Sequence, residues 1–311
     1  MKRCPMRRRQ FLTLAGGTAG LALTAGLFRA GEAKAKVDAV VAAASGRRGP
    51  ENARKAIEAL GGMGTFVSRG DVVVLKPNIG WDRTPEQAAN TDPEVVVALA
   101  ELCLAAGAKK VRVFDRTCND PRRCYASSGI QVAVERFAKQ AHAEGALIVE
   151  QVDKRKFVKI GIPGGETLKE WELYRDSLEA DKIVNVPIAK HHSLAVVTLG
   201  LKNMMGVMGG DRGQIHYRLA DCLVDVNRMF PRQLIVVDAT RILLRNGPSG
   251  GDLGDVKAAG KLFASRDVVA ADVVAAERLF GLAVKDVPHI ARALGSGIGV
   301  DSPARIKVVE C

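Results

Sequence analysis

The stretches DVVVLKPN (residues 71–78) and TDPEVVVALAELCLAAGAKKVRVFDR (residues 91–116) decide the fold. The first has a short continuous apolar run that stops at a lysine and a proline, which is typical of a buried strand. In the second, Asp92 is a suitable N-cap, Pro93 occupies the first helical position and Gly107 ends the helix. VRVFD then resumes a strand pattern. The two stretches together predict one β–α–β unit.

The same alternation of strand and helix patterns continues along the chain. Further segments of this kind are the helical pattern of residues 130–144, the strands ALIVE (146–150), KIVNV (182–186) and LIVVDA (234–239), the helical pattern of residues 266–281 and the strand RIKVVE (305–310). Repeated patterns of this kind indicate the α/β class. We expect a mostly parallel or mixed sheet with helices on both faces, in one large domain or in two intimately joined lobes.

The first 35 residues, MKRCPMRRRQFLTLAGGTAGLALTAGLFRAGEAKA, have the layout of an export signal. A basic start precedes an uncharged stretch of 18 residues, and Ala-Lys-Ala follows a little later. Arg8, Arg9, Phe11 and Leu12 resemble the twin-arginine signal, and the glycine-rich, moderately apolar core fits that export route. Residues 1–35 are therefore expected to be a twin-arginine-type signal peptide.

We expect cleavage after Ala35, which makes the twin-arginine translocase a partner during export and the periplasm, or another extracytoplasmic compartment, the destination. The alternative is an uncleaved membrane anchor, because 18 residues just span a bilayer, although four glycines weaken its hydrophobicity. Beyond the signal, we expect an N-terminal helical lead-in over residues 36–70 and an α/β domain over residues 71–311.

The net charge of +12 is divided between the signal and the rest of the chain. Residues 1–35 contain seven of the 46 basic side chains and one of the 34 acidic ones, so a net charge of +6 remains after cleavage. This charge is mild, and aromatic residues make up only 5% of the chain, too few for a base-stacking platform. We therefore expect no nucleic-acid partner, whereas a small anionic ligand stays open.

The cysteines follow no metal-cluster spacing. Cys118 and Cys124 both lie in the loop-like stretch RTCNDPRRCYASSG, where an oxidising compartment would permit a disulfide between them. No CxxC motif is present, so an iron–sulfur cluster held by this chain alone is not expected.

Polar side chains follow four of the expected strands at the point where each strand ends. The carboxyl ends of parallel strands meet at one edge of a sheet, where ligands usually bind. The side chains at these ends include two lysines, two carboxylates, two amides and a histidine pair, as a site for a polar ligand requires. They are Lys76, Asn78, Asp115, Thr117, Asn185, Lys190, His191, His192 and Asp238.

Five stretches of the chain together resemble the family called domain of unknown function 362. They are VVVLKPNIG, NTDPEVVVALAELCLAAGAKKVRVFD, DKIVNVPIAKHHSLAVVTLGLKNMMGVM, VVDATRILLRNGPSGG and GIGVDSPARIKVVE, and they span the chain from about Asp71 to Glu310. The resemblance places Lys76, Asn78, Lys190, His192, Lys202, Asn203, Asp238, Asn246 and Gly247 on the recurring polar positions of the family domain.

Many proteins of that family carry an added ferredoxin-like segment with clustered cysteines. The resemblance therefore implies proximity to redox chemistry and makes an exported redox protein a candidate partner. This chain departs from that pattern, because it has no such segment before Cys311. Cluster binding is therefore not carried over.

A metal site is one interpretation of the candidate residues. His192 and His216, with Asp238 or Asp115, would supply the histidine and carboxylate ligands that suit zinc or iron. No HxH or HExxH spacing supports this set. Adjacent strand residues point to opposite faces, so only one residue of the His191–His192 pair is expected to face a common ligand.

An anion site is the other interpretation. Lys76, Lys190 and Lys202 would provide positive charge, and Asn78, Asn185 and Asn203 would provide amide donors. The glycine-rich stretch KNMMGVMGGDRG would let backbone N–H groups approach a ligand. A second glycine-rich loop, RNGPSGGDLGD, is expected to be a lid or a wide turn, with Asn246 and Gly247 adopting positive backbone angles.

Two functions from different classes follow. The first is an exported protein that binds a polar, anionic or metal-associated ligand at the carboxyl edge of its sheet, with a redox or acid–base role. In that case His192 would exchange protons and Lys202 would stabilise developing negative charge. The second is a non-catalytic accessory or partner protein of an exported redox system. Whether the chain is an enzyme, and whether a metal ion is its cofactor, stay open.

Overall fold

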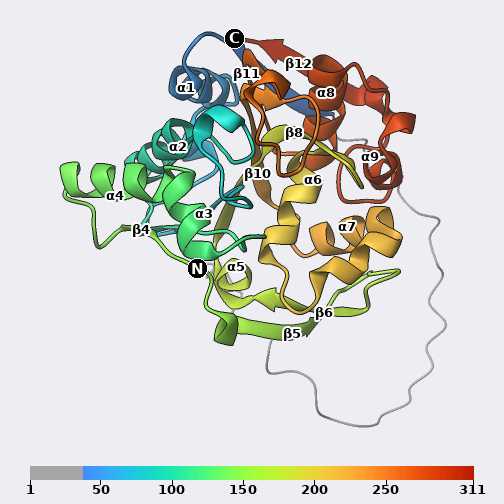
Figure 1. Ribbon diagram of the computed structural model, residues 1–311, viewed down its shortest axis with the longest axis horizontal. Helices are drawn as coiled ribbons and strands as arrows, with labels where there is room; N and C mark the ends of the chain where they lie inside the picture. The colour runs from blue at the N-terminus through green and yellow to red at the C-terminus, as the bar shows by residue number, and fades with distance from the viewer. Residues whose placement is uncertain (1–37) are drawn as a thin grey trace, which may run out of the picture. The chain divides into compact units, whose positions relative to one another are not determined.

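The computed structural model describes residues 38–311, and the expected signal peptide lies outside this range. A ten-stranded sheet forms the centre of the fold (Figure 1). Its strand order is β12-β1-β11-β10-β7-β2-β3-β4, and β8 pairs with both β10 and β9. The strands are β1 (Ala39–Ser45), β2 (Val72–Pro77), β3 (Lys110–Val113), β4 (Leu147–Val149), β7 (Lys182–Val186), β8 (Ile188–His192), β9 (Val196–Thr198), β10 (Gln233–Leu243), β11 (Val256–Ser265) and β12 (Ile306–Glu310).

This sheet is mixed but mostly parallel, as the sequence predicts. Strands β10, β7, β2, β3 and β4 pair in parallel, as do β10 with β8 and β1 with β12. Strand β11 runs antiparallel between β10 and β1, and β9 runs antiparallel to β8. A separate two-stranded sheet consists of β5 (Phe157–Gly161) and β6 (Glu170–Tyr174).

Helices cover both faces of the main sheet, which confirms the predicted fold class. Alternate residues of β10 show why: Leu234 and Val236 are in one hydrophobic cluster, whereas Ile235 and Val237 are in another. The first cluster includes α1 (Gly49–Ala59), α2 (Pro93–Ala105) and α4 (Ile130–Gln140). The other face carries α6 (Gly200–Asn203), α7 (Leu219–Arg228), α8 (Val268–Phe280) and α9 (Pro288–Ala293); α3 (Pro121–Ser127) and α5 (Arg175–Glu179) are short connecting helices.

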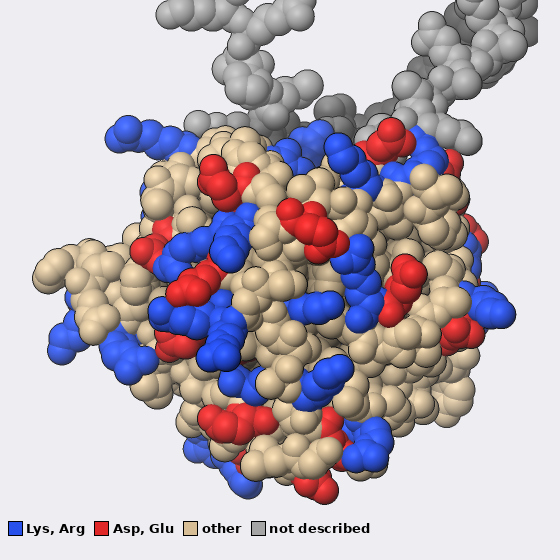
Figure 2. Space-filling model, turned by 90° about the horizontal axis from the view of Figure 1, so that it is seen from above, with Lys and Arg blue, Asp and Glu red and all other residues tan. Residues whose placement is uncertain are grey.

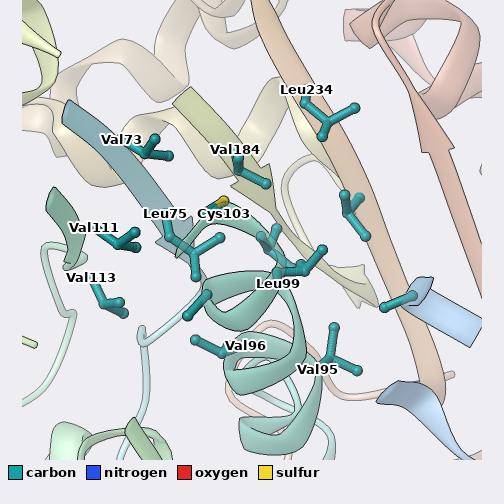
Figure 3. Close-up of a cluster of buried hydrophobic side chains, with 14 of the residues drawn as sticks. Val73, Leu75, Val95, Val96, Leu99, Cys103, Val111, Val113, Val184 and Leu234 are labelled. Atoms are coloured by element: carbon teal, nitrogen blue, oxygen red, sulfur yellow. The ribbon is translucent and has the colours of Figure 1, made fainter. Parts of the chain in front are cut away.

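Helix α2 packs along the parallel strands as its sequence predicts. The Asp92 carboxylate caps the helix by accepting a hydrogen bond from the Glu94 N–H at 2.9 Å. The apolar side chains of this helix, among them Leu99, lie against those of β2, β3, β7 and β10 (Figure 3). Gly107, at φ +92°, follows the end of helix α2 and lies close to the backbone of Arg69. The predicted β–α–β unit is thus confirmed.

The stretch expected to be a helical lead-in, residues 36–70, includes more than helix. It contains α1, but it also contributes β1, which lies in the main sheet between β11 and β12. The AVVAAAS sequence of β1 is alanine-rich, and four consecutive residues of it are buried, so it shows neither strict alternation nor a long apolar run. Residues 38–311 form one compact unit, so the α/β domain begins at β1 and not at residue 71.

On the molecular face drawn in Figure 2, basic and acidic side chains are interspersed. Among residues 38–311, no helix combines the length and the apolar character that crossing a membrane requires.

Candidate functional site

A cavity of about 480 Å³ lies beyond the carboxyl ends of β2 and β3, next to β8 and α6. Because β2 and β3 are parallel neighbours, the residues that follow them lie side by side at one edge of the sheet. Eight of the residues expected at strand ends or in a site line this cavity: Asn78, Asp115, Thr117, Lys190, His192, Lys202, Asn203 and His216.

A buried ion pair forms the floor of this pocket. Lys76 Nζ lies 2.7 Å from Asp115 Oδ1, and these side chains are 0% and 3% exposed. Lys76 also donates to the Pro77 carbonyl at 2.9 Å, and Asp115 Oδ2 accepts from the Ile79 N–H at 2.7 Å. Burial lowers the pKa of Lys76, and the Asp115 carboxylate opposes that shift. A Cβ atom on Gly206 would lie 1.7 Å from Asp115 Oδ1, so only glycine fits over the pair.

A chain of amide side chains supports the pocket from below. Asn78 donates to Asn203 Oδ1 at 2.9 Å, Asn203 donates to Asn185 Oδ1 at 2.8 Å, and Asn185 donates to Gln233 Oε1 at 2.9 Å. Gln233 continues the chain to Asn227 Oδ1 at 3.1 Å. Each amide is oriented by its neighbours, which fixes the position of Asn78 and Asn203 at the pocket. Asn185 thus lies beneath the pocket and does not line it.

Lys190 lines the pocket without a carboxylate partner. Its Nζ donates to the Ala89 carbonyl at 2.5 Å and to Asn78 Oδ1 at 3.2 Å, and the residue is 1% exposed. Burial lowers the pKa of Lys190 to about 7, and the nearby Lys202 contributes to the shift.

Lys202 lies on α6 and is less constrained than Lys190. Within the described part of the chain, its ammonium group makes neither a hydrogen bond nor an ion pair. Burial, together with the positive charges of Arg212 and Lys76, lowers the pKa of Lys202 to about 8. The Asp272 carboxylate of α8 holds the start of α6 by accepting from the N–H groups of Gly200 and Leu201.

His192 is held neutral, which argues against its expected acid–base role near neutral pH. Burial, with the positive charges of Lys202 and Lys190, lowers the pKa of His192 to about 2. Its Nδ1 accepts from the N–H groups of Leu194 and Ala195, both at 3.2 Å, so the ring proton is on Nε2. His192 can therefore donate a hydrogen bond to a ligand, but it does not carry a positive charge.

The expected metal set is not brought together. The rings of His192 and His216 stack with centroids 6.3 Å apart, and His216 Nδ1 lies 2.8 Å from the Gly213 carbonyl. Asp115, the alternative carboxylate, is already paired with Lys76. Over residues 38–311, no group of three or more histidine, cysteine or acidic side chains is arranged to hold a metal ion.

Asp238 does not reach the pocket. It lies in the middle of β10, where Oδ2 accepts from the Asp92 N–H at 2.8 Å and Oδ1 accepts from the Thr240 N–H at 2.9 Å. Burial and the neighbouring Asp92 carboxylate raise its pKa. Asp238 therefore anchors the start of α2, and the metal ligands His192, His216 and Asp238 are not assembled in one place.

Asn246 and Gly247 belong to the loop behind the pocket wall. Asn246, at φ +54°, donates to Asp255 Oδ2 at 2.6 Å, and the Gly247 N–H donates to His191 Nδ1 at 3.1 Å. A Cβ atom on Gly247 would lie 1.9 Å from the His191 carbonyl oxygen, so this close approach requires glycine. Of this loop, Pro248 lines the pocket.

Two arginines and a thiol at the pocket were not identified from the sequence as ligand-binding groups. Arg116 donates to the carbonyls of Met208 and Gly210, and burial and the neighbouring Arg212 lower its pKa. Arg212 donates to the carbonyls of Met205 and Thr117 and to the sulfur of Cys118 at 3.4 Å. Arg116 directly follows the expected strand VRVFD, so its place at a strand end was the signal that could have revealed it.

Cys118 is exposed and Cys124 is buried, and both are free thiols. The disulfide that the sequence permits between them is therefore not formed. Burial raises the pKa of Cys124 to about 11.

The charges around the pocket do not balance. Lys190, Lys202, Arg116 and Arg212 all line it, and within residues 38–311 none of them forms an ion pair with a carboxylate. Asp115 is the one acidic residue of the lining, and its charge is matched by Lys76. The pocket thus has an excess of positive charge, together with amide and imidazole hydrogen-bond donors.

Comparisons with known proteins identify related chains. The profile of the family described as "Domain of unknown function (DUF362)" matches residues 73–277. The thylakoid-associated protein sll1697 of Synechocystis sp. is 30% identical over 229 residues, which cover 71% of this chain and 67% of that protein. The lactate racemase apoprotein from Thermoanaerobacterium thermosaccharolyticum aligns with a TM-score of 0.39 at 14% identity, over 64% of this chain and 51% of the other.

Proposed function

This chain belongs to the DUF362 family, and we propose that it binds a small organic anion in the pocket between β2, β3, β8 and α6. One observation carries the proposal: Lys202, Arg116 and Arg212 bring three positive charges to the pocket, beside the basic amine of Lys190, and no carboxylate of the described residues pairs with any of these side chains. Collecting positive charge in a partly buried space is unfavourable unless a ligand of opposite charge compensates it. A carboxylate or phosphate group supplies that charge.

The size and lining of the pocket indicate what kind of anion fits. A volume of about 480 Å³ lies at the lower end of the range for ligand pockets. Lys202 has a free ammonium group for the anion, and Asn78, which donates one N–H to Asn203, has its other N–H at the same wall. Both N–H groups of Asn203 donate to oxygens of Lys76 and Asn185. His192 adds a neutral N–H donor. The ligand is therefore a compact molecule with one or two anionic groups, rather than a nucleotide or a peptide.

Metal-associated binding is the less supported version of this proposal. Of the residues that the structure describes, only His192 and His216 bring imidazole rings to the pocket, and the surrounding lysines and arginines repel a cation. An anion that binds together with a metal ion would still lie next to these histidines. Metal analysis of the protein, purified with and without the anion, tests this version directly.

Isothermal titration tests the proposal with oxalate, pyruvate and inorganic phosphate as probes. The Lys202→Gln substitution should weaken oxalate binding at least tenfold, because it removes the free ammonium group of the pocket. The matched control is Lys109→Gln, an exposed lysine that follows α2, and it should bind as the parent protein does. Equal affinities for the parent protein and the Lys202→Gln variant, or no binding of any probe, would refute the proposal.

A role as the accessory protein of an exported redox system is a second proposal. It is favoured by two exposed apolar side chains near the mouth of the pocket: Leu194, which lines it, is 68% exposed, and Tyr217, which follows His216, is 93% exposed. Purification from cells that process the signal would show cleavage after Ala35 and retain a bound redox protein. A Leu194→Ser and Tyr217→Ser variant should lose that partner, and retention by the variant would count against this role.

A further inference from the structure

Lys190 differs from the other pocket lysines in how its amine is held. Its side chain is 1% exposed, and among residues 38–311 Nζ donates hydrogen bonds to two acceptors, the Ala89 carbonyl and Asn78 Oδ1. Both acceptors are uncharged. A neutral amine has two N–H bonds and one lone pair, so these two hydrogen bonds use both of its protons. The lone pair then remains for another partner in the cavity that Lys190 lines.

The surroundings favour this neutral form. Lys76 is equally buried, but Asp115 compensates its charge, whereas no carboxylate of the described part of the chain pairs with Lys190. Lys202 and Lys76 lie near enough to oppose a positive charge on Lys190. Desolvation and a neighbouring cation are the two conditions that turn a lysine into a nucleophile at neutral pH. Burial lowers the pKa of Lys190 to about 7, which agrees with this geometry.

We infer that Lys190 is a nucleophile that forms an imine with a small 2-oxo acid bound in this pocket. The inference rests on the proposed function, because the carboxylate of the 2-oxo acid is the anion that the pocket binds. The amine requires a carbonyl carbon as its partner, and Lys202, with its free ammonium group, is placed to hold the adjacent carboxylate. A 2-oxo acid is the simplest compound that offers both groups side by side.

The reaction balances without any further reagent. The lone pair of Lys190 Nζ attacks the carbonyl carbon and forms a carbon–nitrogen bond, while the first Nζ proton passes to the carbonyl oxygen. The resulting hydroxyl group then receives the second Nζ proton and leaves as water, and a carbon–nitrogen double bond remains. Nothing is oxidised or reduced. His192, neutral and protonated on Nε2, is a hydrogen-bond donor in the same lining for the departing oxygen.

Reductive trapping tests the inference on the unmodified protein. The full-length chain is incubated with pyruvate and sodium cyanoborohydride, digested, and mapped by mass spectrometry. The peptide that contains Lys190 should carry one reductively attached pyruvate, and oxalate, which has an anionic group but no ketone, should protect it. The yield should rise as the pH passes 7 and fall above about 8, because the amine must be neutral while Lys202 is still charged.

The outcomes separate this inference from the proposed function. If pyruvate binds in calorimetry but is not trapped on Lys190, or is trapped equally on the exposed Lys109, the imine is refuted and anion binding still stands. If pyruvate, oxalate and phosphate all fail to bind, both the imine and the proposed anion binding are refuted. A Lys190→Arg variant should lose trapping, and the Lys109→Arg control should not. Because mapping identifies the modified residue in the parent protein, the test holds even if the Lys190→Arg variant does not fold.

Discussion

Replacing Asp115 by asparagine tests the buried ion pair under the pocket. The carboxylate accepts from Lys76 Nζ at 2.7 Å and from the Ile79 N–H at 2.7 Å. An asparagine side chain has one oxygen, so it satisfies only one of these donors and turns its NH₂ group toward the other. Losing a hydrogen bond to a charged group costs about 1.5–3 kcal/mol, and an unsatisfied buried donor costs about 1–3 kcal/mol more.

We therefore expect the Asp115→Asn substitution to lower the free energy of unfolding by about 3–5 kcal/mol, the range found when one partner of a buried ion pair is removed. Urea denaturation followed by circular dichroism measures this, with an unchanged dependence on urea concentration as the check for two-state unfolding. The control is Glu101→Gln, which breaks the half-exposed pair with Arg54 and should cost less than about 1 kcal/mol. An Asp115→Asn variant as stable as this control would refute the reasoning.

Three further predictions concern the pocket and its thiols. The affinity for oxalate should fall as the pH rises, first through the pKa of Lys190, which is about 7, and then through that of Lys202, which is about 8, because the anion favours the protonated amines. Calorimetry across this range checks it, and an affinity that rises with pH contradicts it. Gly206→Ala should destabilise the protein by about 1–3 kcal/mol in thermal unfolding, because the new Cβ would clash with the Asp115 carboxylate. The control Gly145→Ala, which has open space around it, should leave the stability unchanged. Equal melting temperatures of the two variants would contradict this prediction. In the native protein, maleimide should label Cys118, and Cys124 only after denaturation, as peptide mapping will show; a peptide pair linked by a disulfide would contradict the free thiols.

The order of elements in the parallel half of the sheet could be predicted because its signals are local. The apolar run of β2, the Asp92 cap and the Gly107 terminus lie within one stretch of about 40 residues. Strand β1 offered no such signal, because alanine favours helices and its partners, β11 and β12, are more than 200 residues away. Tertiary pairing decides the structure of β1, and the local sequence does not show it.

The candidate site was also predicted only in part, where local sequence signals were sufficient. Placing residues at strand ends identified Lys190, which lines the pocket, but misplaced Asp238, because β10 continues five residues beyond it to Leu243. A strand end cannot be located from an apolar run alone when the strand bends at an irregularity after it, as β10 does between Ala239 and Arg241.

The protonation states and the burial of the site residues could not be predicted from the sequence. The low pKa of His192 results first from its burial and then from the positive charge of Lys202, which is ten residues away in the chain. Arg212 comes from a short helical segment that no periodic pattern indicates, and its position follows from hydrogen bonds to the carbonyls of Met205 and Thr117, which lie far apart in the chain. Such features arise from the assembled fold, so the sequence predicted the types of residue at the site better than their protonation states.

The most direct test of the central claim is anomalous diffraction from crystals soaked in selenate, a compact dianion with a strong anomalous signal. We expect a peak inside the pocket, within hydrogen-bonding distance of Lys202 Nζ, that disappears when oxalate is added. Selenate bound only at the molecular surface, with an empty pocket at concentrations that fill those surface sites, would contradict it.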